Sequence, residues 1–197
     1  MRDLLTRMQR AQPAVEAWVS ELHAKSAAQS IAAGATGFPR LGRCFPAPIL
    51  EEARAVTVDV MPFPPVGALG LPELEGLAAM PMAGITFGHM YFLHREHTRE
   101  AIHFHELVHV VQWTTLGMAA FLPTYAVGIA RHGYEASPLE LAAFDLQAKF
   151  EGGDTLPGIV DFIGRHAEQA RQEAENLFRS AGLTMAAHDE RQRTRRG

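Results

Sequence analysis

The sequence predicts an α+β fold, with a helical segment first, a few strands next and helices over the remaining chain. Apolar residues recur at helical spacing through residues 2–31. The stretches AVTVDV (55–60) and ITFGHMYFL (85–93) are rich in the β-branched and aromatic residues that favour strands. From residue 98 onward the apolar residues return to helical spacing. The expected strands therefore lie between two helical regions of the chain.

The length and composition are those of one globular domain. The chain has 197 residues, of which 47% are hydrophobic and 20% are charged, enough for one sizeable core. We expect a single domain over 1–197, with an N-terminal helical segment (1–35), a core (36–150) and a C-terminal helix with a charged tail (151–197). A formal net charge of −4 gives no reason to expect nucleic acid as a partner. Cys44 is alone, which excludes an intrachain disulfide and a four-cysteine zinc site.

Proline and glycine set the expected boundaries in the first half of the chain. Pro13 is expected to divide the helical segment 2–31 in two or to begin its second part. Residues 34–48 and 62–84 are dense in these two residue types. We therefore expect irregular structure in the former range and a long packed loop in the latter. The stretch 85–93 is expected to run as one strand.

A helix containing residues 101–113 is expected after that strand. Thr98 is placed as its N-cap and Gly117 as its stop, after about Leu116. The remaining expected elements are helices over 118–132 (with Pro123 near a start or kink), 137–150 and 157–180, a break at GGD (152–154), and a frayed tail at 188–197.

Neither a signal peptide nor a membrane span is expected. The first twenty residues lack the continuous apolar core of a secretory signal. The longest apolar run, residues 116–130, is shorter than a membrane span and is interrupted by Pro123. We expect a cytoplasmic protein, while export without a cleaved signal and the oligomeric state are left open. The run 116–130 is assigned to the core rather than to a cleft wall, because apolar spacing alone predicts burial.

The stretch AIHFHELVHVVQW (101–113) has almost no polar face, yet it contains three histidines and a glutamate. Within it, His105, Glu106 and His109 form the pattern H-E-x-x-H. Positions i and i+4 share one face of a helix, so both imidazoles can reach one metal ion, and zinc is expected because it accepts imidazole nitrogen. Glu106 is placed to take a proton from a water at that metal. The alternative is that both histidines are core residues paired with protein neighbours.

A third metal ligand is expected downstream of this pattern. The candidates are His132, Glu135, Glu140 and Asp145. The run from Ser137 to Glu140 also has the sequence of a capping box, in which the glutamate binds backbone at the start of a helix. From the residues alone, a role of Glu140 as metal ligand and a role as helix cap are equally expected.

Three stretches resemble a known family. HELVHVVQW (105–113) resembles the extended HELxHVxQ signature of zinc metallopeptidase domains found in bacterial toxin and contractile-injection effector proteins. GITFGHMYFL (84–93) is similar to the strand that these domains place before the signature helix. YEASPLELAAF (134–144) is similar to the Tyr followed by Asn-Pro-x-Glu-x-x-Ala of related single-domain members. The resemblance spans residues 40–150 and is strongest over 103–113.

The resemblance implies a zincin-like fold of the gluzincin type, with a small β-sheet, an active-site helix and further C-terminal helices. It implies a zinc-dependent peptidase that acts on a peptide or protein. In the gluzincin pattern Glu-x-x-Ala-Asp the glutamate is the third zinc ligand, and Glu140 and Ala143 match it. Phe144 stands where the pattern has its aspartate, with Asp145 one residue later, so the partner that orients a zinc histidine departs from the pattern. This departure supports the alternative, a catalytically idle, zinc-stabilised module that binds a protein partner.

Several other polar residues receive supporting roles. Tyr134 is expected to stabilise an oxyanion, with His132 as an equal candidate. His103 lies two residues before His105 and therefore points to another side of the helix, as a packed residue. Gln112 is expected to brace the helix through buried hydrogen bonds. The histidines near the second strand are assigned to a solvated loop rather than to a second metal site: His89, His94 and His97.

Overall fold

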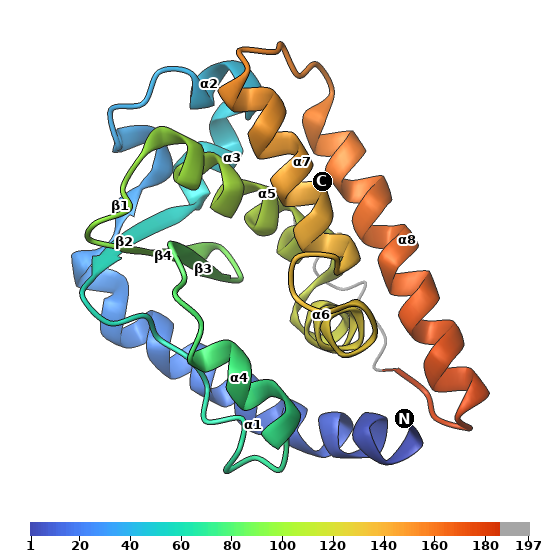
Figure 1. Ribbon diagram of the computed structural model, residues 1–197. Helices are drawn as coiled ribbons and strands as arrows, with labels where there is room; N and C mark the ends of the chain where they lie inside the picture. Colours follow the sequence, from blue (N-terminus) through green and yellow to red (C-terminus); the bar gives the residue numbers. More distant parts are fainter. Residues whose placement is uncertain (186–197) are drawn as a thin grey trace.

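A mixed four-stranded sheet lies on one side of the central helix α5 (Glu100–Leu116), and two long helices lie on its other side (Figure 1). The computed structural model describes residues 1–185, so the tail expected at 188–197 lies outside the described residues. The sheet order is β1-β2-β4-β3, with β2 and β4 parallel and the other two pairs antiparallel. The strands are β1 (Ile31–Ala32), β2 (Arg54–Val58), β3 (Gly84–Phe87) and β4 (Met90–His94). The expected α+β class is confirmed.

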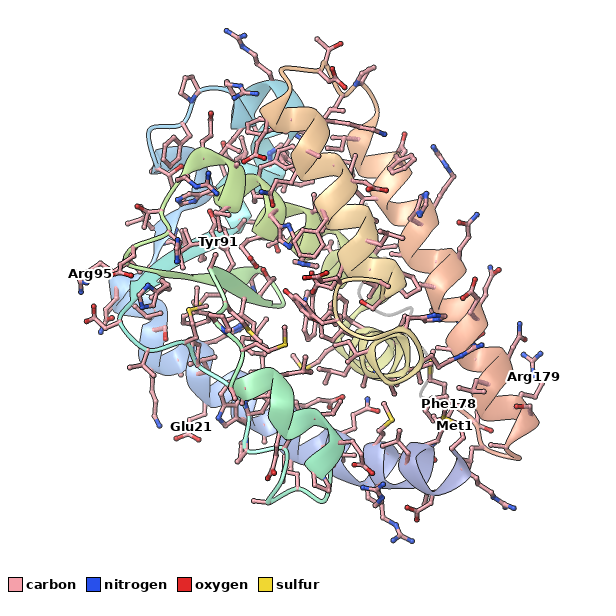
Figure 2. All side chains as sticks on the ribbon, in the orientation of Figure 1. Met1, Glu21, Tyr91, Arg95, Phe178 and Arg179 are labelled. Atoms are coloured by element: carbon pink, nitrogen blue, oxygen red, sulfur yellow. The ribbon has the colours of Figure 1, made fainter. Side chains whose placement is uncertain are left out.

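The second predicted strand is a hairpin, so the expectation of one strand over 85–93 is wrong. β3 and β4 pair with Phe87 opposite Met90, and the two residues between them form the turn. Gly88 has a φ of 65°, in the left-handed region that favours glycine. Tyr91 of β4 points into the molecule, whereas Arg95 beyond the strand lies at the surface (Figure 2). The hairpin brings β3 against α5.

The first helix, α1 (Arg2–Ser26), runs without a break through Pro13. The expectation that Pro13 divides this segment or begins a second helix is wrong. A proline inside a helix removes one backbone hydrogen bond. Apolar side chains on both sides of it are buried in one cluster, which holds the helix together across the proline: Leu5, Met8, Ala11, Val15 and Val19.

Short helices interrupt both segments that are dense in proline and glycine, residues 34–48 and 62–84. α2 (Leu41–Cys44) and α3 (Ala47–Glu52) lie in or next to residues 34–48, so the expectation of irregular structure there is wrong in part. The long loop contains a 3-10 turn, η3 (Pro72–Leu74), and α4 (Glu75–Ala78). Proline occupies the first turn of α3 and of η3, where its missing N–H is not needed. Two further 3-10 turns flank β1, namely η1 (Ala27–Gln29) and η2 (Ala33–Ala35).

Helix α5 is covered over most of its surface, with 14 of its 17 residues buried. It ends at Leu116, and Gly117 follows with a φ of 70°, which confirms the expected stop. The expected N-cap, Thr98, is wrong. Arg99 occupies that position with extended backbone, and no side chain caps the first turn. Thr98 lies one residue too early to reach the first amides of the helix.

Three helices follow α5, as expected. They are α6 (Met118–His132), α7 (Pro138–Glu151) and α8 (Ile159–Ser180). α7 and α8 pack on α5, and α6 packs against α1 and α8. α6 continues through the buried Pro123. Among residues 1–185, no helix combines the length and the apolar character that crossing a membrane requires.

The buried apolar side chains form two clusters, and α5 contributes to both. Trp113 and Leu116 belong to the cluster with α1 and α6. Phe104 and Leu107 belong to the cluster with α7 and the start of α8. The central part of α5, which carries the histidine pattern, therefore lies between two packed regions.

Phe104→Ala tests how far α5 anchors the fold. The Phe104 ring is fully buried, stacks on Phe150 with ring centroids 4.3 Å apart, and lies 5.3 Å from the Phe45 ring. Its removal leaves a cavity, so we expect the free energy of unfolding in urea to fall by about 3–5 kcal/mol. Phe162→Ala on α8, at a side chain that is 36% exposed, is the control with a small effect. Equal losses of unfolding free energy in Phe104→Ala and Phe162→Ala would contradict the role of α5 as an anchor of the fold.

Candidate metal centre

Two imidazoles and one carboxylate converge in the core. His105 and His109 lie one turn apart on α5, and Glu140 lies in the first turn of α7. The two Nε2 atoms are 3.1 Å apart, and each is 3.5 Å from Oε2 of Glu140. All three side chains are buried, and together they form a group that could hold a metal ion.

The separations within this group fit a small tetrahedral ion. Zinc lies about 2.0–2.2 Å from nitrogen and oxygen ligands, so tetrahedral angles set ligand–ligand distances of about 3.3–3.5 Å. The observed distances of 3.1, 3.5 and 3.5 Å are close to these values without any movement of the side chains. Two histidines and a carboxylate are also donors that zinc accepts.

Each histidine is held by a glutamine, which fixes the nitrogen that faces the centre. Gln112 donates its amide N–H to the carbonyl oxygen of Leu139 at 2.9 Å, so its Oε1 faces His109. An amide oxygen only accepts, and therefore Nδ1–H of His109 donates to it at 2.8 Å. His105 Nδ1 donates in the same way to Oε1 of Gln147 at 3.0 Å. Both Nε2 lone pairs are thus left for a cation, and the bracing role expected for Gln112 is supported.

Glu140 is oriented by a tyrosine that the sequence analysis did not single out. The Tyr125 hydroxyl donates to Oε1 of Glu140 at 2.6 Å, while the buried Oε2 has no hydrogen-bond partner among the described residues. The capping-box alternative is not formed, because Ser137 occupies the N-cap without a side-chain bond and Glu140 points to the histidines. An unpartnered buried oxygen facing two imidazole nitrogens is an arrangement that a cation stabilises.

The electrostatics of the group attract positive charge. Burial raises the pKa of the Glu140 carboxyl, but His109 and His105 outweigh it and hold this pKa well below its usual range. Burial lowers the pKa of His109, whereas the Glu140 carboxylate raises it by more, to about 9. The carboxylate therefore favours a positive charge at the point where the three ligand atoms meet.

Glu106 lies beside the group, on the strand side of α5. Its Oε2 accepts a hydrogen bond from the Thr86 hydroxyl at 2.6 Å, and the side chain is buried. Burial raises the pKa of this carboxyl, and the nearby His105 and His109 lower it. A Cβ added at Gly84 would overlap the Glu106 carboxylate, so β3 leaves just enough room for it. Neither Gly84 nor Thr86 of β3 was predicted to contribute to the site, because Thr86 is 20 residues from Glu106 in the sequence.

The other ligand candidates from the sequence are not part of the group. His132, Glu135 and Asp145 are exposed, and the described metal-binding group at α5 does not contain them. The bond that orients His105 is made by Gln147 rather than by Asp145. Phe144, which stands where the family pattern has aspartate, instead packs its ring 4.9 Å from that of His105.

Tyr134 lies beside the group, whereas His132 is exposed. Tyr134 shares a cavity lining with Glu106, His109 and Glu140. Burial and the charge of Glu140 raise the pKa of the Tyr134 hydroxyl, so it stays protonated and can donate a hydrogen bond. Of the two equal candidates from the sequence, Tyr134 lines this cavity and His132 does not.

The remaining histidines have separate surroundings. His103 is buried and its Nδ1 is 2.8 Å from the Tyr91 hydroxyl, which agrees with the packed role expected for it. His94, Glu96 and His97 form a second group that could hold a metal, but it lies in a largely exposed loop. The ring of His89 lies 4.9 Å from that of His23.

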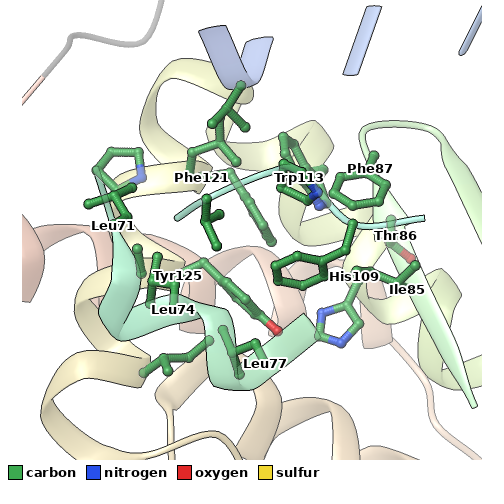
Figure 3. Close-up of a pocket in the computed structure, with 18 of the residues that line it drawn as sticks. Leu71, Leu74, Leu77, Ile85, Thr86, Phe87, His109, Trp113, Phe121 and Tyr125 are labelled. Atoms are coloured by element: carbon green, nitrogen blue, oxygen red, sulfur yellow. The ribbon is translucent and has the colours of Figure 1, made fainter. Parts of the chain in front are cut away.

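A cavity of about 140 Å³ opens beside the candidate metal-binding group of His105, His109 and Glu140 (Figure 3). The Tyr125 hydroxyl lies on the side of His109, and apolar side chains such as Trp113 and Phe121 surround the remaining space. Residues 116–130 were expected to be core rather than a cleft wall. This is wrong in part, because α6 forms one wall of the cavity through Phe121, Tyr125 and other residues.

Comparisons with known proteins add no relative. No family model, curated protein or solved structure matches the chain. The function of the chain is therefore inferred from the geometry of the site.

Tyr125→Phe tests whether the carboxylate is held for a metal. The variant removes the hydrogen bond to Oε1 of Glu140, and loss of such a supporting partner lowers metal affinity by about 10–100-fold. We expect titration of the metal-free protein with Zn²⁺ to show one site in the wild type and this weakening in the variant.

Tyr91→Phe is the matched control, since it removes a buried hydroxyl that contacts His103 and not the metal-binding group. We expect its zinc affinity to equal that of the wild type. Absence of zinc binding by the wild type would instead support the interpretation of His105 and His109 as metal-free core residues.

Proposed function

We propose that the chain is a zinc-dependent peptidase with a zincin-like active site, in which His105, His109 and Glu140 hold the metal. The observation that carries this proposal is the position of Glu106. Its buried carboxylate is fixed by Thr86, lies beside three converging ligand atoms and lines a cavity. A structural zinc site is normally closed by four protein ligands and needs no base.

Zinc bound at this group would polarise a scissile carbonyl and lower the pKa of a water towards about 7. Glu106 takes the proton from that water and returns it to the departing amine. Because Oε2 of Glu106 already accepts from Thr86, we assign the proton transfer to Oε1. The Thr86 bond prevents rotation of the carboxylate, so Oε1 is held in one position before the reaction begins.

Two tyrosines have different roles in this proposal. Tyr125 is engaged with Oε1 of Glu140 and is a positioning residue for the ligand. Tyr134 lines the same cavity and stays protonated, so its hydroxyl donates to the oxygen that gains negative charge when the carbonyl is attacked. The two hydroxyls therefore serve different groups, the Tyr125 hydroxyl a metal ligand and the Tyr134 hydroxyl the substrate oxygen.

Glu106→Gln tests the assignment of the general base. The amide cannot accept a proton, so we expect kcat on a peptide library to fall by about 100- to 10,000-fold while one equivalent of zinc is retained. Glu135→Gln, at an exposed position, is the control that keeps full activity.

The alternative of a catalytically idle, zinc-stabilised module predicts a different result. In that case the wild type and Glu106→Gln would both be inert on every peptide, while His105→Ala would lose zinc and unfold at a lower temperature. Activity in Glu106→Gln equal to the wild type would overturn the role of Glu106 itself.

Gly84→Ala tests whether β3 sets the position of the base. The added methyl group overlaps the Glu106 carboxylate and displaces it from the Thr86 hydroxyl. We expect kcat to fall by about 100-fold, since small misplacements of a catalytic group have effects of this size, with zinc affinity unchanged. Gly42→Ala is the matched control, because its added Cβ meets no atom within 4 Å. Full activity in Gly84→Ala would contradict the proposed position of the base.

A further inference from the structure

We propose that the cavity beside the metal-binding group is a specificity pocket for one large apolar side chain of the substrate, of the size of leucine or phenylalanine. The side chain belongs to a residue that flanks the scissile bond. This inference rests on the proposed function, because it places the scissile carbonyl at the metal-binding group.

Four polar groups of the cavity lie together at one end. Glu106, His109, Tyr134 and Glu140 line it where the metal ligands converge. Gln12 of α1 also lines the cavity, and its amide is bonded to Glu16 and to the Ala119 carbonyl oxygen. The lining elsewhere is almost entirely apolar and includes Val15, Ile85, Phe87, Leu122 and Ala126. A substrate whose carbonyl lies at the polar end therefore has a flanking side chain directed towards apolar walls.

The size of the cavity selects the occupant. A cavity of about 150 Å³ lined by aliphatic and aromatic side chains holds benzene, so the 140 Å³ found here accommodates one aromatic ring or a branched aliphatic group. A small side chain would leave most of this space empty and would lose the apolar contacts. The cavity is also too small for a long acyl chain, which favours a peptide over a lipid as its occupant.

The charges around the cavity exclude ionised side chains. No lysine or arginine lines it within the described part of the chain, and two buried carboxylates, Glu106 and Glu140, lie at its end. An aspartate or glutamate would lose its hydration and be repelled by these carboxylates. A lysine or arginine in the apolar part would lie beyond their reach without a partner.

The N-terminal helix belongs to this pocket. Met8, Ala11 and Val15 of α1 line the cavity, and so do Leu71 and Leu74 of the long loop. The Arg7 guanidinium of α1 donates to the Gly70 carbonyl oxygen at 2.6 Å and pairs with the Glu73 carboxylate, which ties this loop to the helix. The segment 1–35 thus helps to determine which substrate residue fits.

Peptide cleavage by the zinc-loaded wild type is the first test. We compare peptides that differ only at the residues flanking the scissile bond and carry alanine, leucine, phenylalanine, aspartate or lysine there. We expect kcat/KM to be about 10- to 200-fold higher for leucine or phenylalanine than for alanine, and lowest for aspartate. A preference for alanine or for a charged residue would overturn the pocket while leaving the peptidase proposal intact.

The second test measures the pocket without catalysis. Toluene, the side-chain analogue of phenylalanine, is titrated into zinc-loaded Glu106→Gln protein and followed by calorimetry. We expect saturable binding that is weakened at least 10-fold by adding Ala126→Phe, which fills the cavity. Ala130→Phe, at an exposed position of the same helix, is the matched control with unchanged binding.

These readouts separate the two proposals. Toluene binding that is absent, or that is unaffected by Ala126→Phe in a folded, zinc-retaining protein, would overturn the pocket. If Ala126→Phe does not fold, Ala126→Leu replaces it in this test, because the leucine side chain occupies less of the cavity. Binding of toluene that Ala126→Phe removes, together with no cleavage of any peptide, would show an apolar binding cavity but would overturn the peptidase and, with it, the role of the cavity in peptide specificity.

Discussion

Three electron-rich atoms face one another in the interior of this protein, and the surrounding structure serves to hold them there. The Nε2 atoms of His105 and His109 and Oε2 of Glu140 lie 3.1–3.5 Å apart. Separate partners fix the far side of each group: two glutamines for the imidazoles and a tyrosine for the carboxylate. Such an arrangement is unfavourable in a low-dielectric core unless a proton on His109 or a metal cation supplies positive charge between the atoms. The packing of α5, α6 and α7 brings these atoms together in a group that could hold a metal ion.

The nearly complete burial of α5 has two causes that act together. Its apolar residues join both core clusters, which immobilises the helix, and its polar residues face groups supplied by the elements around it. β3 contributes Thr86 to Glu106, α6 contributes Tyr125 to Glu140, and α7 contributes Gln147 to His105. A rigid helix with side chains fixed by neighbouring elements is suited to hold ligands and a base in one geometry.

The sequence predicted what depends on local spacing. The H-E-x-x-H pattern, the stop at Gly117 and the strand around residues 55–58 need only near neighbours, and the structure contains all three. It could not predict the role of Tyr125, whose bond to Glu140 links two helices, or of Gln147, 42 residues from its partner His105. The ambiguity of Glu140 had the same origin, because a cap is a local contact and a ligand is not. Local propensity also failed where tertiary packing overrode it, as in the unbroken helix through Pro13.

The walls of the cavity differ in how they are anchored, and this has a mechanical consequence. Leu71 and Leu74 of the long loop are buried in the same core cluster as residues of α5, α6 and β3, but this loop is also tied to α1 by the partly exposed pair of Arg7 and Glu73. An exposed ion pair is screened by dissolved salt and contributes little free energy. Dissolved salt therefore weakens one contact of the loop wall while leaving its buried apolar contacts in place, so this wall is the part of the cavity on which ionic strength acts most directly.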